Sequence, residues 1–253
     1  MCGRFALIHS WDEIRQFYKI DIQPMNLRPR YNIAPSQPIL SITSSNDGLN
    51  ENYTAGYFRW GLIPGWAKDD SIGTRLINAR AETVHEKSSF RDAYRKRRCL
   101  IPISGFYEWN EAKQPFWITS TNSGFLSLAG IWESWISSSG EQVKTCAILT
   151  TKANKDLSEI HSRMPVILSD SDIKNWLTGS YVGTKLSILN DIVLAPTGEA
   201  ITKWQISKKV NSVSNDNDTL IRSVNDMVSD PVTAEKEDSA QGNLFKYSNV
   251  DKS

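Results

Sequence analysis

The sequence has few cysteines, few histidines and no net charge of consequence. Its three cysteines, Cys2, Cys99 and Cys146, lie far apart and form neither a CxxC pair nor a zinc-ligand spacing. This pattern argues against a disulfide framework and favours a reducing compartment. Lys and Arg number 29 against 28 Asp and Glu, so no global field draws the chain to nucleic acid or membrane. Basic residues crowd the first hundred positions, which still permits a local basic face.

The sequence also lacks an apolar N-terminal run typical of a signal peptide, and it has no membrane-length hydrophobic segment. We therefore expect an intracellular protein without membrane contact, nuclear if the source is eukaryotic and otherwise cytoplasmic. No internal repeat is visible. The 253 residues, 40% hydrophobic and 23% charged, suit an ordinary globular core, and nine Trp enrich it in aromatics.

Short apolar runs separated by turn signals predict a strand-dominated chain. We expect strands at 39–42, 98–102, 116–118, 125–129 and 146–149, and helices at 11–18, 88–96 and 171–177, with Ser10 as an N-cap of the first. The predicted fold is α+β: one domain with twisted mixed and antiparallel sheets in a barrel-like core and flanking helices. Residues 44–53 read as a polar loop, and most of the nine Trp as core residues.

The domain is expected to span residues 1–224. Residues 225–253 are rich in Asp, Ser, Asn, Glu and Lys with isolated apolar side chains, so they cannot bury enough surface to offset their ordering entropy. We predict a disordered acidic and polar tail.

The start of the chain, Met1-Cys2-Gly3, predicts a reactive terminus. Aminopeptidase removes Met before a small residue, which would leave Cys2 with a free α-amine next to its thiol. That amine titrates near ~7.7–8.0, so a useful fraction is nucleophilic at neutral pH. An amine and a thiol on adjacent carbons condense with an aldehyde to an imine and then to a thiazolidine, a ring closure favoured by proximity.

Six blocks occur in this order: MCGRF, YNIAP, WGLIPGW, INARAET, GFYEW and IHSRMP. All but INARAET, which follows WGLIPGW, place a polar or charged group beside aromatics, glycine or proline. Together they resemble the SRAP family, whose members capture abasic sites in single-stranded DNA covalently. The resemblance runs from Cys2 to about Val224. It implies a DNA damage-response protein that forms a DNA–protein crosslink through Cys2, with lyase-like side chemistry, no cofactor and no metal. The expected partner is single-stranded DNA with abasic sites, and the expected state is a monomer.

The resemblance also implies residue roles. Cys2 would form the thiazolidine, Asn78 would orient the sugar, and Glu108 and His161 would transfer protons. The implied DNA-binding residues are Arg4, Asn32, Pro35, Trp66, Arg80, Thr150 and Arg163, with the arginines on phosphates and Asn32, Pro35 and Trp66 against bases. These roles fit the residues themselves. Glu108 lies between Tyr107 and Trp109, and an apolar setting raises a carboxyl pKa. Arginine forks suit phosphates, and aromatics stack on any base.

Plainer structural readings compete with these roles. Asn78 could brace a turn, Glu108 could pair with an arginine, and His161 could be a packed or solvated residue. The basic run from Arg91 to Arg98 is most simply a solvated helix face that doubles as a rim for DNA.

Two other functions stay open at this point. A thiol peptidase with an N-terminal cysteine, acting on itself or on other chains, would use Cys2, His161 and Asn78. A non-covalent single-strand binder would use the aromatic and arginine surface without a free Cys2. In the tail, Gln241, Leu244 and Tyr247 look like a degenerate sliding-clamp-binding box, so a sliding clamp is a further candidate partner.

Overall fold

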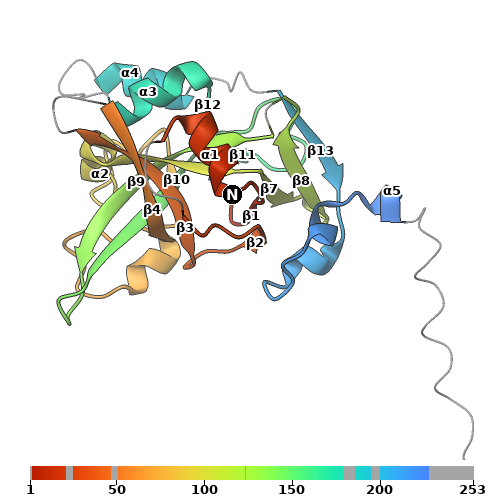
Figure 1. The fold of residues 1–253 in the computed structure, drawn as a ribbon, viewed down its shortest axis with the longest axis horizontal. Coiled ribbons are helices and arrows are strands. Elements are labelled where there is room, and N and C mark those ends of the chain that lie inside the picture. Colours follow the sequence, from red (N-terminus) through yellow and green to blue (C-terminus); the bar gives the residue numbers. More distant parts are fainter. Residues whose placement is uncertain are drawn as a thin grey trace, which may run out of the picture.

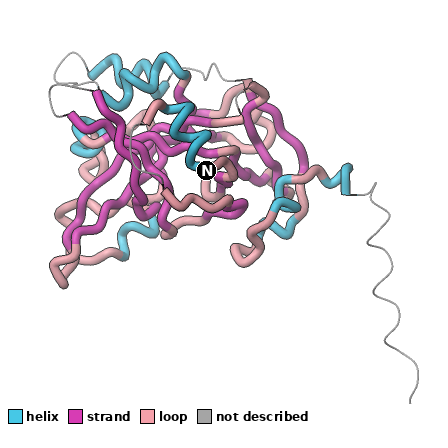
Figure 2. Tube along the Cα trace, in the orientation of Figure 1, coloured by secondary structure: helices cyan, strands magenta, loops and turns pink. Residues whose placement is uncertain are grey.

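Two sheets with helices at their periphery make up the protein (Figure 1, Figure 2). The computed structural model describes residues 2–20, 25–46, 51–122, 124–178, 186–194 and 200–227. The α+β class and the barrel-like core predicted from the sequence are confirmed.

Five strands of the larger sheet close into a barrel. β10 pairs with both β4 and β9, and the ring continues from β4 through β3 and β6 back to β9. The β4–β10 pair is parallel and the others are antiparallel. The barrel strands are β3 (Pro38–Asn46), β4 (Glu51–Trp60), β6 (Arg98–Ile103), β9 (Leu126–Ile136) and β10 (Gln142–Lys152). Three short strands extend the sheet: β5 (Asn78–Arg80) and β11 (Arg163–Pro165) on β10, and β12 (Ile167–Leu168) on β9.

The smaller sheet has five strands, and the first strand of the chain, β1, lies next to one of its edges. Its order is β13 (Ile201–Gln205), β8 (Pro115–Ser120), β7 (Gly105–Trp109), β1 (Phe5–Leu7) and β2 (Arg30–Ile33), all antiparallel. One residue, Ser104, separates β6 of the barrel from β7 of this sheet. The two sheets are therefore joined tightly where the chain crosses between them.

The helices cover the outside of the sheets. They are α1 (Trp11–Tyr18), α2 (Arg91–Lys96), α3 (Asp170–Thr178), α4 (Leu186–Leu194) and α5 (Val224–Met227). Ser10 caps α1 as predicted: its hydroxyl accepts from the Glu13 amide, and the Glu13 carboxylate accepts from the Ser10 amide at 2.7 Å. Trp11, Ile14 and Tyr18 face the core, which fixes the helix on the sheet. Within the described residues, every helix is too short to span a membrane.

Aromatic side chains fill much of the core. Trp60 and Trp176 are fully buried, and Trp117 and Trp135 nearly so. Arg98 differs from the expected solvated helix face. It is 7% exposed, and its guanidinium donates to the carbonyls of Trp176 in α3 and of Tyr94 in α2. Arg98 thus supplies hydrogen bonds and a positive charge at the C-terminal end of α2.

Two glycines of the sequence blocks are required by close packing. Gly61 has a φ of +133°, and a Cβ there would lie 2.5 Å from the Gly73 carbonyl oxygen. A Cβ on Gly105 would lie 2.4 Å from the Trp117 ring. Any side chain at either position would displace backbone or a buried indole. The first glycine of WGLIPGW and the glycine of GFYEW are thus structural, whereas a Cβ on Gly65 would meet no atom within 4 Å.

The segment 44–53, expected to be a loop, is mostly strand. β3 and β4 continue to the Asn46–Glu51 pair, because the ladder hydrogen bonds extend past the buried part of the hairpin. The expected helix at 88–96 begins only at Arg91, where Phe90 precedes it without a side-chain cap. Helix α4 had no clear sequence signal. The first three residues of the predicted tail, 225–227, belong to helix α5, and the rest of the tail lies outside the described residues.

Candidate active site

Strand pairing brings Cys2 next to Glu108. β1 runs antiparallel to β7, with Phe5 opposite Phe106, and the Tyr107 amide donates to the Arg4 carbonyl at 2.9 Å. The same register, continued toward the start of the chain, places Gly3 opposite Glu108, so Cys2 and Glu108 lie on adjacent segments. Cys2 is fully buried, not exposed. Burial first, and then the charge of Glu108, raise the pKa of its thiol far above the usual range, so the thiol stays protonated.

Asn78 reaches the same point from the barrel. It opens β5, which lies parallel to β10 with Asn78 opposite Ile148. Its Nδ2 donates to the Cys2 carbonyl oxygen at 2.8 Å. Its buried Oδ1 has no hydrogen-bond partner among the described residues. Asn78 therefore braces the Cys2 backbone with one end of its amide and offers an acceptor with the other.

Glu108 supplies a buried carboxyl beside Cys2. Its side chain belongs to β7 and is 4% exposed. Burial raises the pKa of this carboxyl, while the nearby charges of the terminal amine and then of His161 lower it by less. The direction is the one expected from its aromatic neighbours. A carboxyl with a raised pKa is suited to donate and regain a proton near neutral pH.

His161 lies just before β11 and is half-buried. The backbone amide of Arg163 donates to its Nδ1 at 3.0 Å. The same Nδ1 lies 3.1 Å from the Arg163 carbonyl oxygen, so both backbone groups of Arg163 hold this side of the ring. A groove of about 620 Å³, which includes Trp109, Asn110 and Ser162, opens beside the ring. His161 is thus held by the Arg163 backbone at the edge of an open groove.

Arg163 is held by a carboxylate that the sequence reasoning did not assign. Its guanidinium donates to both oxygens of Glu82, at 2.7 and 3.0 Å, and to the carbonyl and hydroxyl oxygens of buried Thr150. Burial raises the pKa of Glu82, but the bonds to Arg163 outweigh it and the pKa is lowered. The sequence held one indication of this ion pair: INARAET contains an acidic residue, Glu82, and IHSRMP contains an arginine. Thr150 serves this clamp more than a DNA backbone.

Replacing Glu82 with Gln is expected to loosen this clamp. The charge-assisted fork is lost, so we expect the free energy of unfolding to fall by about 1–3 kcal/mol. The His161 ring should also lose its single environment, because the Arg163 amide that fixes Nδ1 is no longer anchored. Chemical denaturation and the ring NMR signals of His161 report the two effects. Exposed Glu86 in the same turn is the matched control, and Glu86→Gln should stay within about 0.5 kcal/mol of the parent. A Glu82→Gln protein indistinguishable from it contradicts the clamp.

Arg4 and Asn32 form a brace on the other side of the site. Arg4 donates to the Asn32 Oδ1 at 2.8 Å and to the Val210 carbonyl at 2.9 Å. Asn32 is 1% exposed, and its Nδ2 donates to the carbonyls of Val210, Ser212 and Asn215. The side chain of Asn32 therefore ties β2 to the segment after β13, and it presents no surface to a base.

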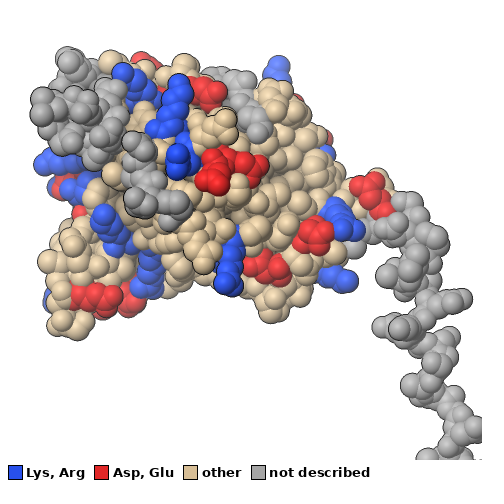
Figure 3. Space-filling model, in the orientation of Figure 1, with Lys and Arg blue, Asp and Glu red and all other residues tan. Residues whose placement is uncertain are grey.

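The remaining predicted residues lie nearer the surface. Trp66 is 61% exposed in the segment after β4, and it can stack on a base. Pro35 is half-buried in the turn between β2 and β3, where the next amide donates to the Trp60 carbonyl. Arg80 is exposed at the end of β5, opposite Thr150. On the face drawn in Figure 3, basic and acidic side chains are interspersed, so that face shows no patch of one sign.

The structure thus brings Cys2, Asn78, Glu108 and His161 into one cluster, with Arg80 and Arg163 beside it. Among the described residues, no group of three His, Cys, Asp or Glu side chains is placed to hold a metal ion. The candidate clamp-binding residues Gln241, Leu244 and Tyr247 lie outside the described residues.

Cys2 thus lies beside the Asn78 amide and the Glu108 carboxyl, and His161 lies close to Glu108. The model of the SOS response associated peptidase (SRAP) family matches residues 1–213. The chain belongs to that family.

Proteins from bacteria and a vertebrate are similar to this chain in sequence. The abasic site processing protein YoqW of Bacillus subtilis is 42% identical over 229 residues, which cover 88% of this chain and all of that protein. YedK of Escherichia coli, also called an abasic site processing protein, is 28% identical and covers 88% of this chain and all of its own. HMCES of Gallus gallus is 32% identical over 220 residues, 75% of this chain and 64% of that protein.

A solved structure shares the fold. A crystal structure of a protein from Bacteroides thetaiotaomicron superposes with a TM-score of 0.77 at 25% identity, and it covers 88% of this chain and 99% of its own. The arrangement of two sheets is therefore that of the family.

Proposed function

We propose that this protein captures abasic sites in single-stranded DNA by a covalent bond through Cys2. The observation that carries the proposal is the meeting of Asn78, Glu108 and His161 around Cys2, from strands that are distant in the sequence. An abasic sugar exposes an aldehyde at C1′ once its ring opens. The aminothiol at a mature N-terminus is the group that reacts with such an aldehyde to give a stable ring.

The reaction would run in two steps after removal of Met1. The Cys2 amine attacks C1′, and loss of one water leaves an imine. The thiol then adds across the C=N bond, with sulfur bonding to carbon and its proton going to nitrogen. The raised pKa of the Cys2 thiol keeps the sulfur protonated until the imine forms, which limits its side reactions. Overall, one water leaves and no redox partner is needed.

The neighbouring residues would serve the steps. Protonated Glu108 donates to the ring oxygen as the sugar opens and to the hydroxyl that leaves as water. The Oδ1 of Asn78 accepts from a sugar hydroxyl, since it has no other partner in the described chain. The His161 imidazole transfers a proton at the edge of the site. Arg80 holds a flanking phosphate, and Trp66 stacks on a base.

The raised thiol pKa disfavours the peptidase alternative. Thiol peptidases attack with a thiolate, and their sites lower the cysteine pKa. Here burial and the Glu108 charge both raise it. A peptide library that yields Cys2-dependent turnover would support the alternative against this argument.

Intact mass spectrometry tests the proposal directly. The purified protein is expected to lack Met1. After mixing with an oligonucleotide that carries one abasic site, its mass should increase by the oligonucleotide less one water, and the product should survive heating. Full reaction of material that retains Met1 would overturn the mechanism. An intact oligonucleotide of the same sequence is the control and should add no mass.

A further inference from the structure

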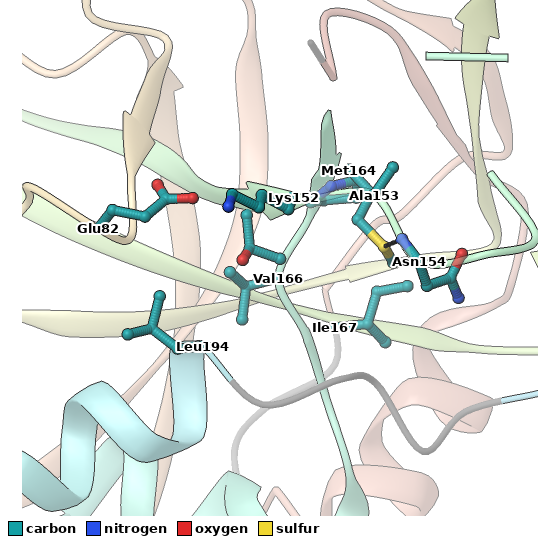
Figure 4. A pocket seen from close by; sticks show the side chains of 10 residues that line it. Glu82, Lys152, Ala153, Asn154, Met164, Val166, Ile167 and Leu194 are labelled. Carbon is teal, nitrogen blue, oxygen red and sulfur yellow. Dashed lines mark hydrogen bonds between the residues drawn. The ribbon is translucent and has the colours of Figure 1, made fainter. Parts of the chain in front are cut away.

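A hollow of about 360 Å³ lies between the ends of β10 and β11 and the last residue of α4 (Figure 4). Its floor is apolar and comes from Met164, Val166 and Ile167, with Leu194 at one side. Leu194 is 48% exposed, so the hollow is open to solvent. The volume exceeds that of one aromatic heterocycle and is at the lower end for small-molecule sites.

Polar groups stand on the rim of this hollow. Figure 4 shows the Glu82 carboxylate and the Lys152 side chain at one end and the Asn154 amide at the other. A carboxylate accepts hydrogen bonds, an ammonium donates them, and an amide does both. An apolar floor with acceptors and donors at its edge suits a flat ring with a polar perimeter.

The hollow continues the edge of the candidate active site. Along β10, Ile148 pairs with Asn78, Thr150 pairs with Arg80, and Lys152 follows two residues later. At about 3.3 Å per residue, Lys152 is therefore ~13 Å from the level of Asn78. Glu82 links the two places directly, because it both borders the hollow and binds Arg163.

The burial of Cys2 explains why a strand would need such a hollow. Cys2 is fully buried in the chain that carries Met1, and Glu108 beside it is only 4% exposed, so a sugar can reach this cluster only if the strand bends inward. Bending separates the neighbouring bases from one another, and their lost stacking must be offset by contacts with the protein. The exposed Arg80 can hold the phosphate in between.

We propose that this hollow binds one unstacked nucleobase of the same DNA strand, within about four nucleotides of the captured sugar. The range follows from stacked DNA advancing about 3.4 Å per nucleotide along a strand, and an unstacked strand advancing further. The base lies on the floor of Met164, Val166 and Ile167, and its edge meets Glu82, Lys152 and Asn154. This inference rests on the proposed capture of abasic DNA.

Baseless nucleotides locate the position. A series of oligonucleotides carries one reactive abasic site and one tetrahydrofuran residue, which has no base and no aldehyde, at each of four positions on either side. The crosslinking rate at limiting protein should fall about tenfold at one position and much less elsewhere, as expected for one lost base contact. An equal effect at all positions, or none at any, would overturn the proposal.

Filling the hollow tests the site itself. Ala153 borders it, and Ala153→Phe should abolish the difference between the oligonucleotide with the base at that position and the one without it. Exposed Ala200, at the start of β13 in the other sheet, is the matched control, and Ala200→Phe should retain the tenfold difference. An Ala153→Phe protein that retains the difference shows that the base binds elsewhere.

A fluorescence arm separates this inference from the capture chemistry. A 2-aminopurine base at the located position, or scanned along a strand whose only damage is tetrahydrofuran, should brighten when the protein binds and unstacks it. Brightening on the tetrahydrofuran strand, together with no covalent adduct on a strand of the same sequence that carries a reactive abasic site, would refute the capture reaction and leave the base site standing. A covalent adduct without brightening at any position would refute the base site alone.

Discussion

A protein with Cys2 replaced by Ser is expected to form no heat-stable adduct with abasic DNA. Its terminal amine still forms the imine, which borohydride traps. The hydroxyl is a poorer nucleophile than the thiol and does not close a lasting ring, so the imine reverts or undergoes β-elimination. We therefore expect the heated adduct to fall to background on a denaturing gel, the borohydride-dependent adduct to persist, and strand cleavage to increase.

The two other cysteines provide the controls. Cys99 and Cys146 are as fully buried as Cys2, but they lie on β6 and β10 of the barrel. Cys99→Ala and Cys146→Ala should keep the heat-stable adduct, with at most a modest loss of stability. The covalent mechanism is wrong if Cys2→Ser gives the same heat-stable adduct without borohydride. A non-covalent single-strand binder, in contrast, would bind intact and abasic strands equally in all of these variants.

The sequence predicted the residues of the site better than the way they meet. Cys2, Glu108 and His161 each stand in a short block that carries glycine, proline or aromatics, and Asn78 stands in the block INARAET, which is part of the family resemblance. Each could therefore be found locally. Their meeting depends on the antiparallel β1–β7 pair and the parallel β5–β10 pair. No local pattern specifies which distant strands pair. Strand β5 has only three residues, too few to show the alternation of polar and apolar side chains by which a strand is predicted.

Two residues for which the family resemblance implies DNA contacts also make contacts within the protein. The polar atoms of Asn32 and Arg163 bind groups that are distant in the sequence. Asn32 bonds to carbonyls about 180 residues away, and Arg163 bonds to a carboxylate 81 residues away. Partners this distant are invisible in a sequence. The sequence shows that glycines stand beside the site residues. The reason that no other residue fits at Gly105 is its packing against Trp117, which only the structure shows.

Replacing Glu108 with Gln is expected to slow crosslinking by about 10²–10⁴-fold, the usual range for loss of a general acid or base. Gln keeps the shape of the side chain but cannot transfer a proton to the opening sugar. Single-turnover rates with the abasic oligonucleotide give the size of the loss. Glu141 is exposed between β9 and β10, and Glu141→Gln is the control that should react at the parent rate. A Glu108→Gln protein as fast as this control would exclude Glu108 from proton transfer.

The pH profile tells the role of Glu108 apart from a merely structural one. The reaction needs an unprotonated Cys2 amine, which becomes available toward ~7.7–8.0, and a protonated Glu108. Because burial raises the Glu108 pKa, the acid form persists toward neutral pH and is lost as pH rises through that pKa. The parent rate should therefore rise and then fall with pH. In Glu108→Gln the falling limb should be absent, since only the amine then titrates.

Stability should change in the opposite sense to activity. A carboxyl whose pKa is raised on folding binds its proton more tightly in the folded state than in the unfolded state. The free energy of unfolding then falls as pH rises from the unfolded pKa, about 4.3, through the raised folded pKa, and the penalty is complete above it. Gln carries no charge and escapes this penalty. Glu108→Gln should melt at a higher temperature than the parent at neutral pH, and the difference should vanish in acid. A variant that is both slower and less stable at neutral pH would show that Glu108 holds the site together as an ion-pair partner, which opposes its assignment as a buried acid.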